Sequence, residues 1–293
     1  MNKIIVIVGP TGVGKTKLSI ELAKKLNGEI INADSTQVFK DLDIATAKAT
    51  LEEQENIPHH LIDIKETTED YTVYDFQYDA RNKIDEILSH NKTPIMVGGT
   101  GLYIKASLYN YEFEEENHKF NYDDYSNEEL YEKLLKIDPQ TKIHKNNRKR
   151  VERALSYYEI HHVVMDNNKG NELLYDAIFI GLTIDRTVLY DRINKRVDVM
   201  VKNGLLEEAQ KIYESKIRTK AVMTPIGYKE LFDYFENKSS LAECLELIKQ
   251  RSRKYAKRQY TWFNNQMNVK WFNVEIDNFT STVNEILEYI EKI

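Results

Sequence analysis

The sequence contains few of the features that mark secreted, disulfide-stabilised or membrane-embedded proteins. Its 293 residues include one cysteine, Cys244, which excludes an intramolecular disulfide and gives no basis for a cysteine-rich metal site. No apolar run approaches the ~18 residues that a membrane helix needs. The chain starts directly with an apolar segment, without the pattern of a signal peptide. We therefore expect a cytoplasmic protein with no membrane segment, and we place Cys244 in the core.

A strong excess of charge of one sign is missing as well. The chain has 41 Lys and Arg against 47 Asp and Glu, a formal net charge of −6, which argues only weakly against a nucleic-acid partner. Residues 112–132 hold nine acidic side chains and one lysine, whereas residues 249–258 hold six basic side chains and no acid. Residues 142–153 form a second basic segment. Local patches decide whether a polyanion binds, although a solvated helix face explains each basic segment about equally well.

The most specific motif follows the apolar residues 3–8. It consists of Gly9, Pro10, Thr11, Gly12, Val13, Gly14, Lys15 and Thr16. This is the P-loop pattern, in which glycines let backbone N–H groups converge on phosphate, Lys15 adds a positive charge and the Thr16 hydroxyl can ligate Mg²⁺. Leucines at positions 18, 22 and 26 predict a helix that runs from about residue 15 to residue 27 and aims its positive end at the same anion. The motif alone points first to ATP or GTP, and an ordinary glycine turn is the alternative.

Two further segments place polar groups after predicted strands. Residues 29–33 form a short apolar strand that leads to Asp34, which should emerge at the same sheet edge as the P-loop. A carboxylate there can ligate magnesium or accept a proton, unless Asp34 or Ser35 only caps the next helix. Residues 94–97 form another strand, and the glycine-rich turn at residues 98–101 lets the backbone approach a ligand.

Two further pairs of polar residues are candidates for binding a ligand or a metal ion. Arg192 and Arg196 share one helix face and suit an anionic ligand, although an exposed pair bridging acids such as Asp191 is the alternative. His59 and His60 are adjacent, so on a strand they point to opposite faces, and no third ligand is spaced to join them. We predict no metal site at these histidines.

The order of these segments predicts an α/β fold, with a P-loop NTPase-like parallel sheet flanked by helices and a helical insertion. We assign residues 1–112 and 173–293 to the core and residues 113–172 to the insertion, which ends in a polar loop at residues 165–172. The predicted insertion helices span residues 127–136 and 147–158. Their predicted inward residues are Leu130, Leu134, Leu135, Val151, Leu155 and Tyr158.

Helices are also predicted in the core at residues 74–88, 205–214 and 241–263. The last of these is the longest and carries Lys249, Arg253 and Lys257 at four-residue intervals along another face. Its predicted buried stripe consists of Leu241, Leu245, Ile248, Tyr255 and Trp262.

Eight motifs occur in the order typical of one family. They are the P-loop and residues 32–39, 43–48, 59–63, 98–103, 150–155 and 226–231, followed by the stretch Tyr-Ala-Lys-Arg-Gln-Tyr-Thr-Trp-Phe at residues 255–263. With these motifs, the chain resembles the bacterial tRNA dimethylallyltransferases of the tRNA isopentenyltransferase family over nearly its whole length. It departs from the family pattern at Ala45, Ala49, Lys145, Asn147 and Lys149.

The resemblance implies transfer of a dimethylallyl group from dimethylallyl diphosphate to N6 of adenosine 37 in the anticodon stem-loop of tRNA. It assigns catalysis to Asp34, as the base, and to Lys15, Thr16 and Thr100. It assigns diphosphate or nucleotide binding to the P-loop with Arg192 and Arg196, and Mg²⁺ to Thr16. The tRNA contacts that it implies are Asp34, Ser35, Thr36, Gln37, Thr100, Lys149, Arg150, Arg153, Lys257, Arg258 and Gln259. We expect a monomer.

Three other functions were considered. A small-molecule or nucleoside kinase would share the P-loop and the arginine pair but has no need for a basic, aromatic-ended helix at residues 249–263. A regulatory GTPase is disfavoured because the Asn-Lys-x-Asp match at residues 82–85 lies inside the predicted helix at residues 74–88, not in a loop after a strand where it could contact a base. A non-enzymatic RNA-binding module would explain only the basic segments.

Overall fold

The computed structural model describes residues 3–113, 120–164 and 170–293, and these divide into two compact units. The first unit contains residues 1–109 and 173–293, and the second contains residues 110–172, where the sequence suggested 113–172. Most of the predicted polar loop at residues 165–172 and part of the acidic segment lie outside the described residues.

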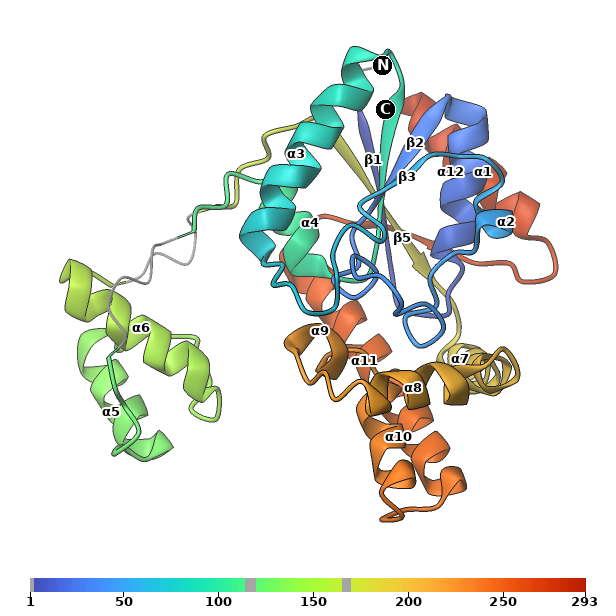
Figure 1. Ribbon diagram of the computed structural model, residues 1–293. Helices are drawn as coiled ribbons and strands as arrows, with labels where there is room; N and C mark the ends of the chain where they lie inside the picture. The colour runs from blue at the N-terminus through green and yellow to red at the C-terminus, as the bar shows by residue number, and fades with distance from the viewer. Residues whose placement is uncertain (1–2, 114–119, 165–169) are drawn as a thin grey trace. The chain divides into compact units, whose positions relative to one another are not determined.

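The first unit is built around a six-stranded parallel sheet, as the predicted α/β class requires (Figure 1). The strand order is β3-β2-β4-β1-β5-β6. The strands are β1 (Ile4–Val8), β2 (Gly28–Asn32), β3 (His59–His60), β4 (Thr93–Val97), β5 (Ala177–Thr183) and β6 (Lys270–Asn273). Because every strand pair is parallel, the carboxyl ends of β1, β2, β4 and β5 lie at one edge. The segments that follow them therefore meet there.

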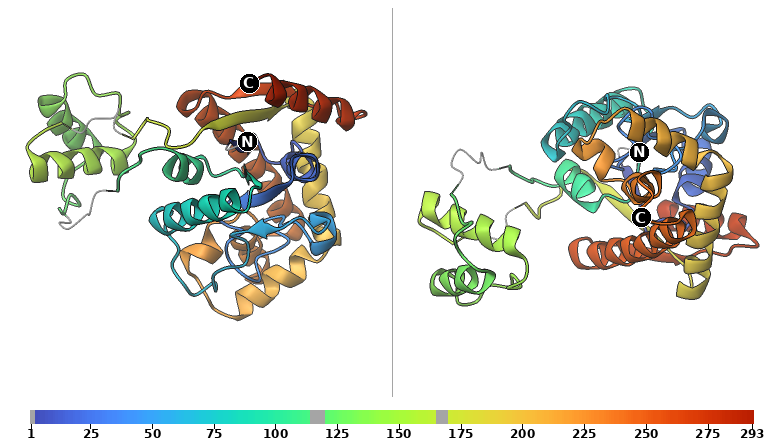
Figure 2. Two further views of the ribbon diagram at one scale, coloured as in Figure 1. Left: turned by 90° about the horizontal axis from the view of Figure 1, so that it is seen from above. Right: turned by 60° about the horizontal axis from the view of Figure 1, so that its bottom comes forward.

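Both faces of the sheet are buried, which explains why β1 is a continuous apolar run. Ile4, Val6 and Val8 face one core cluster, and Ile5 and Ile7 face the other. The two faces are covered by different helices, and Figures 1 and 2 show α3 and α12 on opposite sides. The helices packed on the first cluster include α3 (Val73–Ser89), α4 (Gly101–Leu108), α8 (Leu205–Glu214), α10 (Tyr228–Phe235) and α11 (Leu241–Gln266). Those on the second include α1 (Lys15–Leu26), α7 (Arg186–Lys202) and α12 (Phe279–Lys292). Two short helices, α2 (Leu51–Gln54) and α9 (Lys220–Met223), lie in connections.

The predicted helix boundaries agree with the structure to within a few residues. The helix after the P-loop ends at Asn27, which adopts the left-handed conformation that terminates helices. Helix α11 begins with a capping box formed by Ser240 and Glu243. Cys244 is 2% exposed, as expected for a core residue.

The predicted buried stripe of α11 was only partly correct. Ile248 is buried as expected, but the other fully buried positions are Cys244, Ala256, Gln259 and Phe263. The predicted aromatic residues Tyr255 and Trp262 are only partly buried. The second half of α11 packs closely on the 98–101 turn, where the missing side chains of Gly99 and Gly101 leave room for Gln259 and Trp262.

The second unit pairs helix α5 (Asn127–Ile137) with helix α6 (Arg148–His161). Its core consists of Leu130, Leu134, Val151, Ala154 and Leu155. Two predictions were wrong here: Leu135 is 37% exposed, and Tyr157 rather than Tyr158 is buried. Each residue advances about 100° around a helix, so the neighbour of a buried residue points sideways.

Candidate active site at the carboxyl edge of the sheet

The P-loop has the backbone conformation that binds an anion. Gly9, Gly12 and Gly14 have φ angles of 141°, 82° and 114°, in the left-handed region that favours glycine. Helix α1 begins at Lys15, and the first N–H groups of a helix have no partner within it. These amides, together with the helix dipole, make the loop a phosphate site. The Lys15 ammonium donates to the carbonyl oxygens of Gly9 and Pro10, at 2.9 Å each.

Lys15 is held among other charges. Burial and the nearby positive charge of Arg196 lower the pKa of Lys15 to about 7, while Asp34 acts in the opposite direction. Burial also lowers the pKa of Arg196. A bound polyanion would raise both pKa values because it stabilises the charged forms. The site therefore has the electrostatics of an anion pocket.

Helix α7 brings its arginines to the P-loop, as a role in anion binding requires. Arg192 Nε donates to the Gly12 carbonyl at 2.9 Å, and an Arg196 Nη donates to Thr11 Oγ1 at 3.1 Å. The alternative partner of the pair, Asp191, instead forms an ion pair with Lys195 at 2.8 Å. Both arginines line the cavity above the loop.

Asp34 lies beside this anion pocket, at the end of β2. Its Oδ1 accepts hydrogen bonds from the Thr36 amide at 3.0 Å and the Thr36 hydroxyl at 2.7 Å, so it stabilises a turn rather than capping a helix. Burial together with the negative charge of Asp34 raises the pKa of Tyr103 to about 12. The same two causes raise the pKa of Tyr255.

The second glycine turn places Thr100 next to the Asp34 segment. The Thr100 amide donates to the Ala33 carbonyl at 3.2 Å, and Thr100 Oγ1 accepts a hydrogen bond from the Ser35 amide at 3.1 Å. The Thr100 hydroxyl also donates to Ser35 Oγ at 3.3 Å. The structure thus brings Thr100 to the segment around Asp34, about 65 positions earlier in the sequence.

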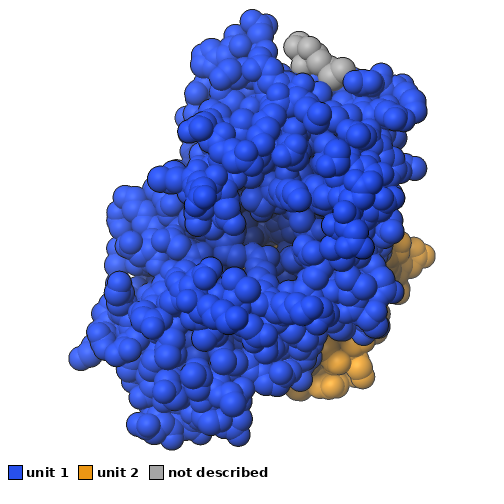
Figure 3. Space-filling model, turned by 90° about the vertical axis from the view of Figure 1, so that its right-hand side faces the viewer, with its two compact units in different colours: residues 1–109, 173–293 blue, residues 110–172 orange. Residues whose placement is uncertain are grey.

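Two cavities meet at Asp34 in the first unit, whose surface is hollowed in Figure 3. The first is about 830 Å³ and contains the P-loop, Arg192 and Arg196 in its wall. The second is about 850 Å³, and its wall includes Ser35 together with Arg251, Lys254 and Arg258 of α11. The residues common to both are Thr11, Asp34, Thr46, Arg196 and Tyr255. A ligand in each cavity would therefore meet the other beside the Asp34 carboxylate.

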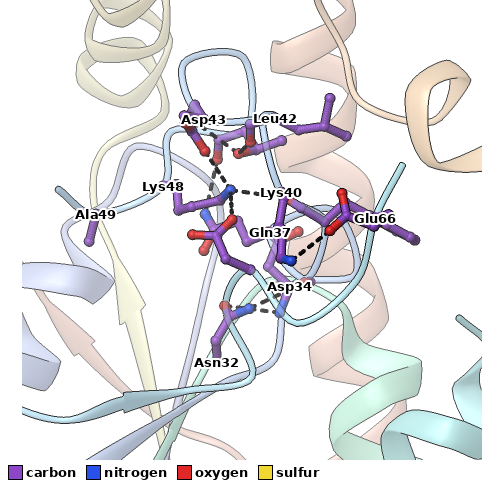
Figure 4. Close-up of polar contacts among 12 residues, drawn as sticks. Asn32, Asp34, Gln37, Lys40, Leu42, Asp43, Lys48, Ala49 and Glu66 are labelled. Atoms are coloured by element: carbon purple, nitrogen blue, oxygen red, sulfur yellow. Dashed lines mark hydrogen bonds and ion pairs between the residues drawn. The ribbon is translucent and has the colours of Figure 1, made fainter. Parts of the chain in front are cut away.

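The loop at residues 43–48, which is one of the family motifs, forms part of both walls. Gln37 Nε2 donates to the Thr46 carbonyl at 3.0 Å, and Lys48 forms ion pairs with Asp43 and Asp63 (Figure 4). Glu208 of α8 accepts hydrogen bonds from the backbone amides of residues 43–45. No local pattern links Glu208 to this loop, so only the fold reveals the contact.

The predicted RNA-binding residues differ in exposure. Lys149, Arg150 and Arg153 of α6 are exposed, as are Lys257 and Arg258 of α11. Gln259 is only 5% exposed, and both ends of its amide are hydrogen-bonded within the protein. Gln259 therefore does not offer its side chain to a surface ligand.

The basic segment of α11 is partly neutralised. Lys249, Arg251 and Arg253 form ion pairs with Asp198, Glu230 and Glu246, respectively. Within the described residues, Lys254, Lys257 and Arg258 form no salt bridge. These three carry the positive charge that remains available to a polyanion.

The described residues offer few side chains that could together bind a metal ion. Within the described residues, no group of three or more His, Cys, Asp or Glu side chains could hold an ion. His60 contacts Glu29 at 2.6 Å, and His59 Nδ1 contacts the Ile57 carbonyl at 2.8 Å. Thr16 is exposed and lines the P-loop cavity, which fits a Mg²⁺ ion that takes most of its oxygen ligands from phosphate and water.

A family model described as IPP transferase matches residues 37–266. The chain belongs to the IPP transferase family. This confirms the resemblance found in the sequence motifs.

Among the helices of the described residues, none combines the length and apolarity needed to cross a bilayer.

Curated relatives and solved structures cover nearly the whole chain. The tRNA dimethylallyltransferase of Anoxybacillus flavithermus is 50% identical over 99% of this chain and 96% of its own length. That of Bacillus mycoides is 48% identical over 99% and 95%. The full-length tRNA isopentenylpyrophosphate transferase structure from Bacillus halodurans has a TM-score of 0.77 at 43% identity, covering 100% and 98% of the two chains. A eukaryotic dimethylallyltransferase acting on tRNA has a TM-score of 0.81 at 32% identity, covering 97% of this chain and 77% of its own.

Proposed function

We propose that this enzyme transfers a dimethylallyl group from dimethylallyl diphosphate to N6 of adenosine 37 in tRNA and releases diphosphate. The observation that carries the proposal is the position of Asp34, which borders both the P-loop cavity and the second cavity. Relatives with this activity in their names cover nearly the whole chain and support it.

The P-loop cavity suits the donor. Breaking the bond between the allylic carbon and the diphosphate oxygen places negative charge on the leaving group. Lys15, the first amides of α1, Arg192 and Arg196 can stabilise that charge without moving far. When bound at Thr16 and the diphosphate oxygens, Mg²⁺ would supply further positive charge.

The Asp34 side suits the acceptor. The N6 amine of adenine is a weak nucleophile, and it must lose a proton as its nitrogen bonds to the allylic carbon. The Asp34 carboxylate can accept that proton, while Thr100 and Ser35 hold the neighbouring backbone in place. A base inside a stacked anticodon loop cannot reach this position, so the nucleotide must flip out into the second cavity.

The exposed basic residues suit the rest of the RNA. Lys149, Arg150 and Arg153 in the second unit and Lys257 and Arg258 in the first can contact phosphates of the anticodon stem-loop. Every group in the proposed site lies on one chain, so we propose that a monomer is sufficient. A tRNA substrate also fits our expectation of a cytoplasmic location.

A transfer assay with an anticodon stem-loop tests this function. Label from dimethylallyl diphosphate should reach the RNA that carries A37 and should not reach the same RNA with G37. Equal transfer to the G37 RNA would contradict the assigned target. No transfer to RNA, combined with phosphoryl transfer from ATP to a nucleoside or small metabolite, would support the kinase alternative instead.

A further inference from the structure

The side chain of Gln259 joins two loops of the candidate site. Its Oε1 accepts a hydrogen bond from the Thr11 amide of the P-loop at 2.9 Å. Its Nε2 donates to the Gly99 carbonyl in the second glycine turn at 3.1 Å. Since a backbone N–H can only donate and a carbonyl can only accept, these two partners fix the orientation of the amide.

Gln259 is almost completely buried, in the wall of the P-loop cavity. The side chain is 5% exposed, and a Cβ atom added to Gly99 would lie 2.1 Å from Gln259 Nε2. The Tyr255 hydroxyl, one turn earlier on α11, interacts with both Gln259 and Thr100. Both its hydrogen bonds and its close packing against Gly99 therefore hold the glutamine amide in place.

Each partner of Gln259 leads to a different half of the proposed reaction. Thr11 belongs to the P-loop, and its hydroxyl also accepts the hydrogen bond from Arg196. Gly99 precedes Thr100, which holds the Ser35 amide beside Asp34. One side chain thus connects the loop that would hold the leaving group with the segment that would hold the base.

We propose that Gln259 is a positioning residue that sets the separation between the P-loop and the Asp34–Thr100 segment. This inference rests on the proposed prenyl transfer, in which the allylic carbon must lie within reach of N6. A misplacement of about 1 Å between reacting groups can reduce a rate by about 10²-fold. Gln259 acts through Thr11 and Gly99 and does not itself contact RNA at the surface.

The Gln259→Glu variant tests this role because a carboxyl group changes its bonding with pH. The ionised carboxylate can accept from the Thr11 amide but repels the Gly99 carbonyl. The protonated acid can accept from one and donate to the other, as glutamine does. Burial and the adjacent carbonyl raise the pKa of such a carboxyl group, so restoration should occur as the pH falls toward 6.

We expect kcat of Gln259→Glu to be about 10²-fold below wild type at pH 8 and within about 10-fold of it at pH 6. The KM for dimethylallyl diphosphate should change much less than kcat. The P-loop cavity that Gln259 lines also has Lys15, Asp34, Arg196 and Tyr255 in its wall. The kcat of the variant and of wild type is therefore measured at every pH, and the two are compared as a ratio. That ratio removes only the titration that is identical in the two proteins. The new carboxylate shares the cavity with Lys15, so the uncharged Gln259→Met variant is the reference for any change in the titration of Lys15.

Gln266→Glu is the matched control, because Gln266 lies on the same helix, is exposed and contacts Lys105 at 3.2 Å. Its activity ratio to wild type should stay near one at every pH. Gln259→Met, which keeps the bulk but removes both hydrogen bonds, should lower kcat by a similar factor with no pH-dependent restoration. Gly99→Ala reaches the same contact from the opposite side and should also lower kcat.

Thermal unfolding of each variant separates positioning from loss of fold. A constant Gln259→Glu ratio between pH 6 and pH 8 in a folded variant would overturn the inference. If that variant does not fold, a kcat of Gln259→Met or of Gly99→Ala equal to that of wild type would also overturn the inference. Because wild type is assayed in parallel, absence of transfer in wild type would refute the proposed function, whereas a flat ratio with active wild type would refute only the role of Gln259.

Discussion

The two glycine turns of the site use glycine for different reasons. In the P-loop, Gly9, Gly12 and Gly14 adopt positive φ angles that other residues rarely adopt. In the 98–101 turn, no glycine has a positive φ. There, side chains are excluded by neighbours, since a Cβ on Gly101 would lie 2.1 Å from the Trp262 ring and one on Gly98 would lie 2.2 Å from the Ala33 carbonyl.

The difference separates a local requirement from a tertiary one. The P-loop needs glycine because its own backbone must curl around an anion. The second turn needs glycine because β2 and α11 approach it closely. A substitution at Gly99 or Gly101 can therefore be relieved by trimming a neighbouring side chain of α11. One at Gly98, which faces the Ala33 backbone, or in the P-loop cannot.

The largest effect should come from Lys15→Met, at the end of the P-loop. Removing the cation beside the leaving group should lower kcat/KM for transfer by about 10³-fold. Lys25→Met, an exposed change on the same helix, serves as the control and should leave transfer unchanged. A loss below about 10-fold for Lys15→Met would mean that this ammonium does not stabilise the leaving group.

Gly12→Ala tests the conformational requirement. An alanine at the observed φ of 82° should destabilise the fold by about 1–2 kcal/mol, measured by urea unfolding. Its Cβ would lie 3.3 Å from Ile193, yet trimming that neighbour should not help. In a double-mutant cycle with Ile193→Ala, we expect a coupling below about 0.5 kcal/mol. Full rescue by Ile193→Ala would show that packing, rather than φ, requires glycine here.

Gly99→Ala tests the packing requirement in the same way. Apart from the neighbours of Gly99 in the chain, Gln259 is the only one of the described residues with an atom within 3.4 Å of the added Cβ. The unfolding free energies of Gly99→Ala, Gln259→Ala and the double variant should therefore give a coupling of about 1 kcal/mol or more. Additive effects would place the cause elsewhere and would remove the contrast between the two turns.

Lys15 should make the stability of the protein depend on pH through the P-loop, whereas the 98–101 turn contains no titratable side chain. The folded-state pKa of Lys15, about 7, lies below the ordinary lysine value of 10.5, chiefly because of burial. Between these values the unfolded chain binds more protons, so stability without ligand should rise as the pH increases from 7 toward 10. Melting temperatures at pH 7 and pH 9.5 should show a smaller rise for Lys15→Met than for wild type. Equal rises would contradict the lowered pKa.

The smallest effect should come from the basic face of α11. Lys257→Ala should lower the slope of log affinity for the stem-loop against log salt by about 1, because one phosphate contact is lost. Lys249→Ala, on the same helix but paired with Asp198 at 2.6 Å, should change the slope less. A larger change of slope for Lys249→Ala than for Lys257→Ala would show that the side of α11 that carries Lys249 faces the RNA.

Much of the fold could be predicted from local pattern. The strand at β1, the helix after the P-loop and the α/β class follow from apolar periodicity and glycine placement, which report on neighbouring residues in the chain. The errors at Leu135 and Tyr158 arose where a helix face had to be chosen without knowledge of its partner. On α11, the burial of Gln259 could not be inferred, since a glutamine beside Lys257 and Arg258 has the pattern of a surface residue.

The sequence by itself determined the phosphate cradle, because the curl of residues 9–16 depends on its own glycines and on the helix that starts at Lys15. Its motif order also determined the family. Only the tertiary structure decided which distant groups meet that cradle: Arg196 through Thr11, Asp34 at the wall shared by both cavities, and Gln259 between the two turns. These contacts join residues up to 248 positions apart, and the parallel sheet brings them to one edge.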